Sequence, residues 1–204
     1  MNESVSRNRE DEHRAKNALL LAGISLFAEK GYASTSVREI VALAGVTKPV
    51  LYYYFQSKEG LFRAILDWAA EMQEQLLKEA SHMDGTFLER IGFLYRRIYE
   101  QLQENRDLFK MIHNLIFGPP QGVPCYDTER YHDRMLEAVK VIYEESLEKG
   151  EVKRADADEV AMMIVGVTDY CFHLDYLHTN SFDSDRSQRL LHLAFQGLSR
   201  RNDA

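Results

Sequence analysis

Apolar residues recur at intervals of three and four along most of the chain, which is the pattern of amphipathic helices. The clearest stripe lies in residues 58–80 and consists of Leu61, Ile65, Trp68, Ala69, Met72 and Leu76. Similar patterns predict helices at about residues 87–102, 105–117, 127–149, 156–178 and 184–199. The alternation typical of β-strands is absent from the sequence. The pattern therefore predicts an all-α fold of about nine helices.

The segment around Gly45 contains closely spaced signals for helix starts and turns. Ser36 followed by Glu39 is a capping box, in which a hydroxyl and a carboxylate satisfy free N–H groups at the beginning of a helix. The helix predicted over residues 37–44 ends at Gly45, which readily takes a left-handed backbone conformation. Thr47 is expected to cap the next short helix. Two helices joined by a short glycine-containing turn are typical of a helix-turn-helix motif.

The second of these short helices has an apolar side and an outward side. Leu51 and Phe55 are four residues apart, so they face the same way and are expected inside. The opposite side carries Lys48, Pro49, Tyr52 and Tyr53. Exposed tyrosines beside a lysine suit hydrogen bonds to phosphate and contacts with thymine methyl groups. The alternative is that Tyr52, Tyr53 and Tyr54 are partly buried packing residues.

Three stretches keep the order and spacing of a known family: AEKGY at residues 28–32, TSVREI at 35–40 and AGVTKPVLYYYFQSKEGLF at 44–62. This part of the chain, roughly residues 14–66, resembles the DNA-binding domain of TetR-family transcriptional regulators. The resemblance implies an all-helical homodimer whose three N-terminal helices bind a DNA operator. It also implies a larger helical domain that dimerises and binds a small molecule, and that ligand binding releases DNA. The sequence departs from the family pattern at Gly23, Val41, Pro49 and Tyr54.

Carried over position by position, the resemblance implies a DNA-reading surface of Thr47, Lys48, Pro49, Tyr52 and Tyr53. It also implies phosphate contacts from Thr35 and Ser36 at the start of one helix and from Lys58 at the start of another. Helix N-termini favour phosphate because of their free N–H groups and their dipole. The alternative for Lys58 is an ordinary solvated lysine. The implied division is residues 1–63 for an N-terminal arm and the DNA-binding domain, and residues 64–204 for effector binding and dimerisation.

The charge of the chain is divided in a similar way. The whole chain has a net charge of −7, which argues against nonspecific coating of nucleic acid. Residues 1–63 carry a net charge of +2, and residues 64–204 carry −9. A mildly basic N-terminal part (residues 1–63, called the head below) joined to an acidic remainder favours localised contact with DNA.

The last two predicted helices are candidates for a dimer surface. Residues 160–174 are apolar nearly all round, which is unusual for a surface helix of a monomer. The resemblance places a homodimer interface on these two helices, and a fully internal core helix is the alternative for the first. Dimerisation would set two heads on successive turns of one DNA face, so a roughly palindromic operator is expected.

The larger domain also supplies aromatic, methionine and histidine side chains of the kind that line hydrophobic ligand pockets. The candidates for contact with a small hydrophobic effector are Tyr95, Tyr99, Phe109, His113, Phe117, Tyr131, His132, Met135, Met163, Tyr170 and His173. Ordinary core packing is the alternative for each of them.

Other classes of function have little support in the sequence. It contains no His-Glu-x-x-His zinc motif, no glycine-rich phosphate loop and no Gly-x-Ser-x-Gly motif. We therefore expect neither an enzyme nor a metal site, and no cofactor. Two cysteines, Cys125 and Cys171, lack a paired spacing. The apolar runs are too short to span a bilayer and there is no export signal, so a cytoplasmic location is expected.

These observations predict a DNA-binding transcriptional regulator, a repressor that a small hydrophobic ligand releases from a palindromic operator. An activator or a ligand-independent regulator of the same fold stays open as an alternative. A metal-responsive regulator is a further alternative.

Overall fold

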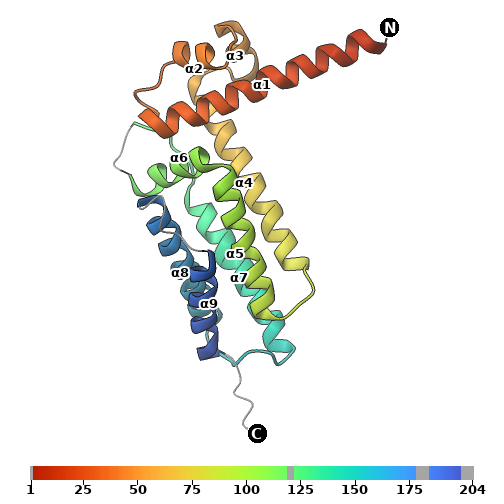
Figure 1. Ribbon diagram of the computed structural model, residues 1–204, viewed down its shortest axis with the longest axis vertical. Coiled ribbons are helices and arrows are strands. Elements are labelled where there is room, and N and C mark those ends of the chain that lie inside the picture. The colour runs from red at the N-terminus through yellow and green to blue at the C-terminus, as the bar shows by residue number, and fades with distance from the viewer. Residues whose placement is uncertain (1, 119–121, 178–183, 199–204) are drawn as a thin grey trace. The chain divides into compact units, whose positions relative to one another are not determined.

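The computed structural model describes residues 2–118, 122–177 and 184–198, and it confirms the all-α fold (Figure 1). The helices in these ranges are α1 (Asn2–Lys30), α2 (Val37–Leu43), α3 (Lys48–Phe55), α4 (Lys58–His82), α5 (Phe87–Glu104), α6 (Arg106–Phe117), α7 (Glu129–Glu148), α8 (Ala157–Leu177) and α9 (Ser184–Leu198). The ends expected near residues 178 and 199 lie outside the described residues. Within the described ranges, no helix combines the length and the apolar character that a membrane span needs.

The chain forms two compact units, and each unit combines two separate stretches of the sequence. The N-terminal unit consists of residues 1–71 and 105–127, and the C-terminal unit consists of residues 72–104 and 128–204. Helix α4 therefore contributes residues to both units, and α6 belongs to the N-terminal one. The functional division expected at residue 63 stays a prediction. The polar residues at the N-terminus, expected to form an arm, are instead the first turns of α1.

The N-terminal unit is built around α1, which contacts α2, α3 and α6. Phe27, Tyr32 and Phe62 form an aromatic cluster, with ring centroids 5.0–5.6 Å apart, beside the connection from α1 to α2. Gly23 on α1 faces α4 closely, since a Cβ atom there would lie 3.0 Å from side-chain atoms of Leu61 and Ile65. A side chain at position 23 would therefore require Leu61 and Ile65 to shift.

The C-terminal unit is a bundle of α5, α7, α8 and α9 with the last turns of α4. Its largest fully buried side chains include Leu94, Tyr143 and Phe87, which belong to α5 and α7. A second capping box starts α5, because Thr86 Oγ1 accepts from the Glu89 N–H while Glu89 Oε2 accepts from the Thr86 N–H. Amphipathic faces at helical spacing thus bury one continuous core.

Arg90 is a charged side chain inside this bundle. Its side chain is 1% exposed, and it donates to the carbonyl oxygens of Ala80 and Ser81 at the end of α4 and to Glu145 on α7. The last carbonyls of a helix have no partner within the helix. Arg90 supplies those partners, so it ties α4, α5 and α7 together within the C-terminal unit.

Replacing Arg90 with methionine is expected to lower the free energy of unfolding by about 1–3 kcal/mol, the usual cost of leaving a buried polar group unpaired. Glu145→Gln is the matched control, because its carboxylate is half exposed and its ion pair contributes less than about 1 kcal/mol. Urea unfolding followed by circular dichroism measures both. Equal losses for the two variants would contradict the assigned role of the guanidinium.

Candidate nucleic-acid interface

Helix α2 begins at the capping box that the sequence predicts. Ser36 Oγ accepts from the Glu39 N–H at 3.3 Å, and Glu39 Oε2 accepts from the Ser36 N–H at 2.9 Å. Glu39 also forms an ion pair with Lys30 at the end of α1, with 2.7 Å between Nζ and Oε1. Gly45 follows α2 with a φ of +66°, as expected for the residue that ends the helix.

Helix α3 is held to the unit by its inward side. Leu51 is fully buried and Phe55 is nearly so. Thr47 occupies the N-cap position with an extended backbone, but its side chain makes no capping hydrogen bond. Pro49 lies in the first turn, where a missing N–H costs nothing. The buried pair fixes which side of α3 faces solvent.

The outward side of α3 is exposed, as the sequence predicts. Tyr52 is 48% exposed and Tyr53 is 75% exposed, and Lys48 and Pro49 are exposed beside them. Tyr54 differs, because it is half-buried and its ring meets that of Tyr53 edge-on at 4.9 Å. The packing alternative therefore applies to Tyr54 alone. The role of the exposed residues in DNA binding stays a prediction.

Thr35 was expected to contact a DNA phosphate, and its position in the structure differs from that expectation. Its side chain is 2% exposed, and its hydroxyl lies within hydrogen-bond distance of the carbonyl oxygens of Gly31 at 2.8 Å and Leu26 at 3.2 Å. A buried hydroxyl that donates to the backbone is not available to DNA. Thr35 instead holds the segment between α1 and α2 against the end of α1.

Ser36 is exposed, but its donors are occupied. Its N–H and its hydroxyl both donate to Glu39 Oε2, at 2.9 and 2.8 Å. A phosphate at this position would meet the Glu39 carboxylate as well. The capping box therefore starts α2 without leaving the phosphate donor that was expected there.

Lys58 also binds groups of the protein itself. Its ammonium donates to the carbonyl oxygens of Tyr32 and Thr35, each at 2.8 Å, and lies 4.1 Å from the centre of the Tyr32 ring. Burial lowers the pKa of Lys58 below its ordinary value. The side chain is therefore not the solvated lysine of the alternative, because it binds the α1–α2 connection, and its expected phosphate contact stays a prediction.

The turn from α3 to α4 depends on a close backbone approach that the sequence analysis missed. Gln56 has a φ of +64°, and the Gly60 N–H donates to Ser57 Oγ at 2.9 Å. A Cβ atom at Gly60 would lie 1.9 Å from the Phe55 carbonyl oxygen. Only glycine fits there, because real Cβ atoms do not approach so closely. The signal was present in the sequence as a glycine in a first helical turn.

The effector candidates are divided between the two compact units, and their role in ligand binding stays a prediction. Phe109, His113 and Phe117 lie on α6 in the N-terminal unit, whereas the other candidates lie on α5, α7 and α8 in the C-terminal unit. Tyr95 is a core residue whose hydroxyl donates to the Ile164 carbonyl oxygen at 3.0 Å. Burial raises the pKa of Tyr95 well above its ordinary value.

Several other candidates are also accounted for by packing, pairing or exposure. Met135 and Met163 pack against the core of the C-terminal unit. His132 on α7 meets Asp169 on α8, with 3.1 Å between Nε2 and Oδ2. Burial raises the pKa of Asp169, and the nearby His132 opposes that shift. Tyr170 is mostly exposed.

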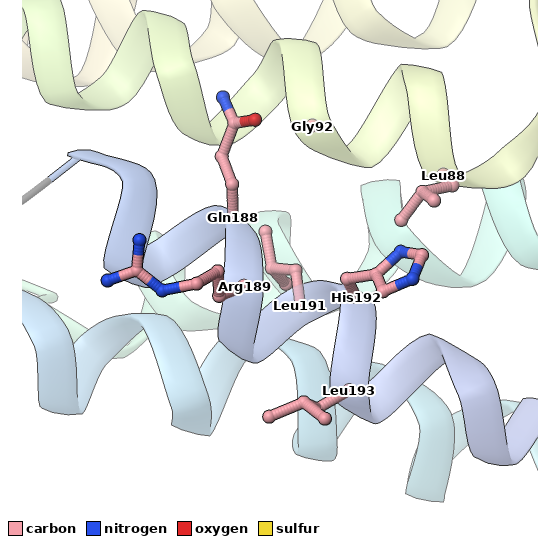
Figure 2. Close-up of a pocket in the computed structure, with 7 residues that line it drawn as sticks. All are labelled: Leu88, Gly92, Gln188, Arg189, Leu191, His192 and Leu193. Atoms are coloured by element: carbon pink, nitrogen blue, oxygen red, sulfur yellow. The ribbon is translucent and has the colours of Figure 1, made fainter.

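A groove of about 680 Å³ lies between α5 and α9, away from the predicted effector residues (Figure 2). Its lining residues are Leu88, Gly92, Gln188, Arg189, Leu191, His192 and Leu193. Figure 2 shows Gln188 and His192 extending toward α5, while Leu193 extends away from it. None of the candidates drawn from the sequence lines this groove. Among the described residues, no group of three or more His, Cys, Asp or Glu side chains is placed to hold a metal ion.

Comparison with known proteins finds a family match in the N-terminal part of the chain. Residues 19–65 match the family model described as bacterial regulatory proteins, tetR family. The chain is 31% identical over 80 residues to the HTH-type transcriptional repressor BepR of Brucella suis, covering 39% of this chain and 38% of BepR. It is 42% identical over 65 residues to the HTH-type transcriptional activator FasR of Mycolicibacterium smegmatis, covering 32% of this chain and 29% of FasR. These matches thus cover less than half of either relative.

The fold extends the likeness along most of the chain. The SmeT–triclosan complex is similar with a TM-score of 0.76 at 17% identity, covering 92% of this chain and 93% of that one. At that identity, the likeness concerns the fold alone. The matched segment contains α2, α3 and the turn between them. The likeness to the tetR family of bacterial regulatory proteins is thus established for residues 19–65.

The pH dependence of stability tests the geometry around Glu39. Hydrogen bonds from Lys30 and then from Ser36 lower the pKa of Glu39 from 4.5 to about 2. The ionised form is therefore favoured in the folded protein, so its contribution to stability is present above pH 4.5 and is lost as the pH falls toward 2. Glu39→Gln should be less stable at pH 7, and the difference should shrink at lower pH. Unfolding free energies measured from pH 2 to 7 check this, and a constant difference would contradict it.

Proposed function

We propose that the protein is a DNA-binding transcriptional regulator, a repressor that leaves a palindromic operator when a small hydrophobic ligand binds. The observation that carries the proposal is the outward side of α3. Lys48, Tyr52 and Tyr53 are exposed on a short helix whose other side is anchored by Leu51 and Phe55. In a helix-turn-helix motif the second helix enters the major groove and contacts base edges.

The charge distribution supports localised DNA contact. Residues 1–63 carry a net charge of +2 and the remaining chain carries −9. Because one head is only mildly basic, we propose that the two heads of a dimer must bind together to reach an affinity for the operator that is sufficient for regulation. The reading surface is proposed to consist of Thr47, Lys48, Pro49, Tyr52 and Tyr53. Thr35, Ser36 and Lys58 are left out, because their donors bind groups of the protein itself.

Homodimerisation through α8 and α9 is part of the proposal. Met162, Gly166 and Tyr170 follow one another at intervals of four along α8, and all three are exposed. Leu190 and Leu193 are exposed on α9. Contiguous exposed apolar side chains of this kind favour an interface with another chain. In the isolated chain, α8 is thus not the fully internal helix of the alternative interpretation.

The sign of regulation and the ligand class rest on weaker support. One relative is named a repressor and another an activator, so both signs occur among similar sequences. A similar structure holds triclosan, a small hydrophobic compound, bound to SmeT. We infer the same broad ligand class here. A metal-responsive regulator is less well supported, since the described residues hold no metal-binding cluster.

Release requires that the ligand bind one conformation better than another, because equal affinity for both shifts no equilibrium. Helix α4 contributes residues to both units. We therefore propose that α4 transmits the conformational change from the effector site to the DNA-binding head. The test is operator affinity with and without a ligand found by thermal-shift screening. Equal affinities in the presence of a bound ligand would reject this mechanism.

DNA binding itself is tested by selecting duplexes from a randomised library. The selected duplex should be palindromic and bind at least about 10³-fold more tightly than a random duplex at physiological salt. Fluorescence anisotropy measures both affinities. Equal affinity for selected and random duplexes would reject a specific regulator.

Lys48→Ala should weaken binding to the selected duplex by about 1–3 kcal/mol per head if the ammonium contacts a base edge. Lys78→Ala is the matched control, since Lys78 is an exposed lysine of the C-terminal unit paired with Glu74. Anisotropy titrations of both variants on the selected and random duplexes measure the effect. Unchanged affinity of Lys48→Ala would remove Lys48 from the reading surface.

Met162→Asp should convert the dimer to monomers at micromolar concentration, because it sets a charge in the apolar surface of α8. Leu21→Asp is the control, since Leu21 is equally exposed but lies on α1. Sedimentation velocity gives the mass of each variant. If the Met162→Asp variant remained dimeric, the dimer interface would have to lie on another surface.

A further inference from the structure

The ammonium group of Lys58 joins two segments that lie far apart in the sequence. Lys58 is the first residue of α4, and the carbonyls that it binds belong to Tyr32 and Thr35, which precede α2. Both hydrogen bonds are 2.8 Å long, and the ammonium also faces the Tyr32 ring at 4.1 Å. A cation over an aromatic face is attracted by the negative face of the ring. Three contacts therefore hold the Lys58 side chain in place.

The segment that Lys58 binds has no regular structure of its own. Residues 31–36 connect α1 to α2, and within this connection the Tyr32 carbonyl oxygen also accepts from the Thr35 N–H at 3.3 Å. Thr35 binds this segment to α1 through its hydroxyl, and Lys58 binds it to α4. The start of α2 is thus attached to both long helices of the N-terminal unit by specific hydrogen bonds.

We propose that Lys58 is a positioning residue for DNA binding, one that sets the helix-turn-helix relative to α4 without touching DNA. The inference rests on the proposed function, since it concerns the same DNA-binding surface. Two of the three ammonium donors of Lys58 serve the protein backbone. Contact with phosphate would be limited to the third donor, while the other two hold the backbone. A rotation of the first turn of α4 carries the α1–α2 connection with it through the same two bonds.

Salt dependence separates a positioning lysine from one that contacts phosphate. Each phosphate neutralised contributes about 0.9 to the slope of log affinity against log salt concentration. Removing a phosphate-contacting lysine therefore flattens the slope, whereas removing a positioning lysine weakens binding at every salt concentration and leaves the slope unchanged. Lys48 is the internal reference, because it is an exposed lysine on the proposed reading surface.

The experiment compares Lys58→Met, Lys58→Arg and Lys48→Met with the unaltered protein. The probe is the duplex that the unaltered protein selects from a randomised library, and anisotropy is measured from 50 to 300 mM salt, well below the melting temperature of each variant. Lys58→Met should bind at least 10-fold more weakly with an unchanged slope and melt at a lower temperature. Lys58→Arg, which keeps the donors, should recover most of the affinity. Lys48→Met removes a lysine proposed to contact a base edge, so it should weaken binding to the selected duplex more than binding to a random duplex.

Three results would overturn the inference. A slope that flattens in Lys58→Met would make Lys58 a phosphate contact. Unchanged affinity of folded Lys58→Met, with a lowered melting temperature, would make its role structural only. Failure of the unaltered protein to bind any duplex would reject the proposed function and the positioning role together. The first two results leave the proposed function intact, so the two failures are distinguishable.

Discussion

The burial of Leu51 and Phe55 is the interaction on which the proposed DNA-binding head depends. Because these side chains are four residues apart, they form one inward row on α3 and leave Tyr52 and Tyr53 on the outward side. A helix of this length gains little stability from its own hydrogen bonds and relies on tertiary packing. The anchored row therefore determines both that α3 exists and which side chains it presents.

Backbone geometry at the two ends of α3 places the helix between two tight turns. Gly45 turns the chain with a positive φ before the helix, and Gly60 permits the close approach of α4 behind it. The first turn of α4 is in turn bonded through Lys58 to the segment before α2. The head thus behaves as a set of short helices fixed by a few backbone contacts, which suits recognition of a rigid duplex.

Features encoded within a few neighbouring residues could be predicted from the sequence. The capping box of Ser36 and Glu39, the turn at Gly45 and the helix periodicities depend on local spacing, and the structure confirms them. The partners of Thr35 and Lys58 could not be predicted in this way. A lysine at a helix start suits phosphate, solvent or a distant carbonyl equally well, and only tertiary structure brings Tyr32 within reach. The α5–α9 groove could not be predicted from the sequence either, because the helices that form its walls lie about a hundred residues apart in the chain.

The most direct test of the account is the solvent accessibility of Tyr52 and Tyr53 with and without DNA. Hydroxyl-radical footprinting read by mass spectrometry reports both residues, and Phe117, an exposed aromatic residue on α6, serves as the reference. The account predicts that a selected duplex protects Tyr52 and Tyr53 strongly and leaves Phe117 reactive. Tyrosines that stay as reactive in the complex as in the free protein would contradict the claim that the outward side of α3 reads DNA.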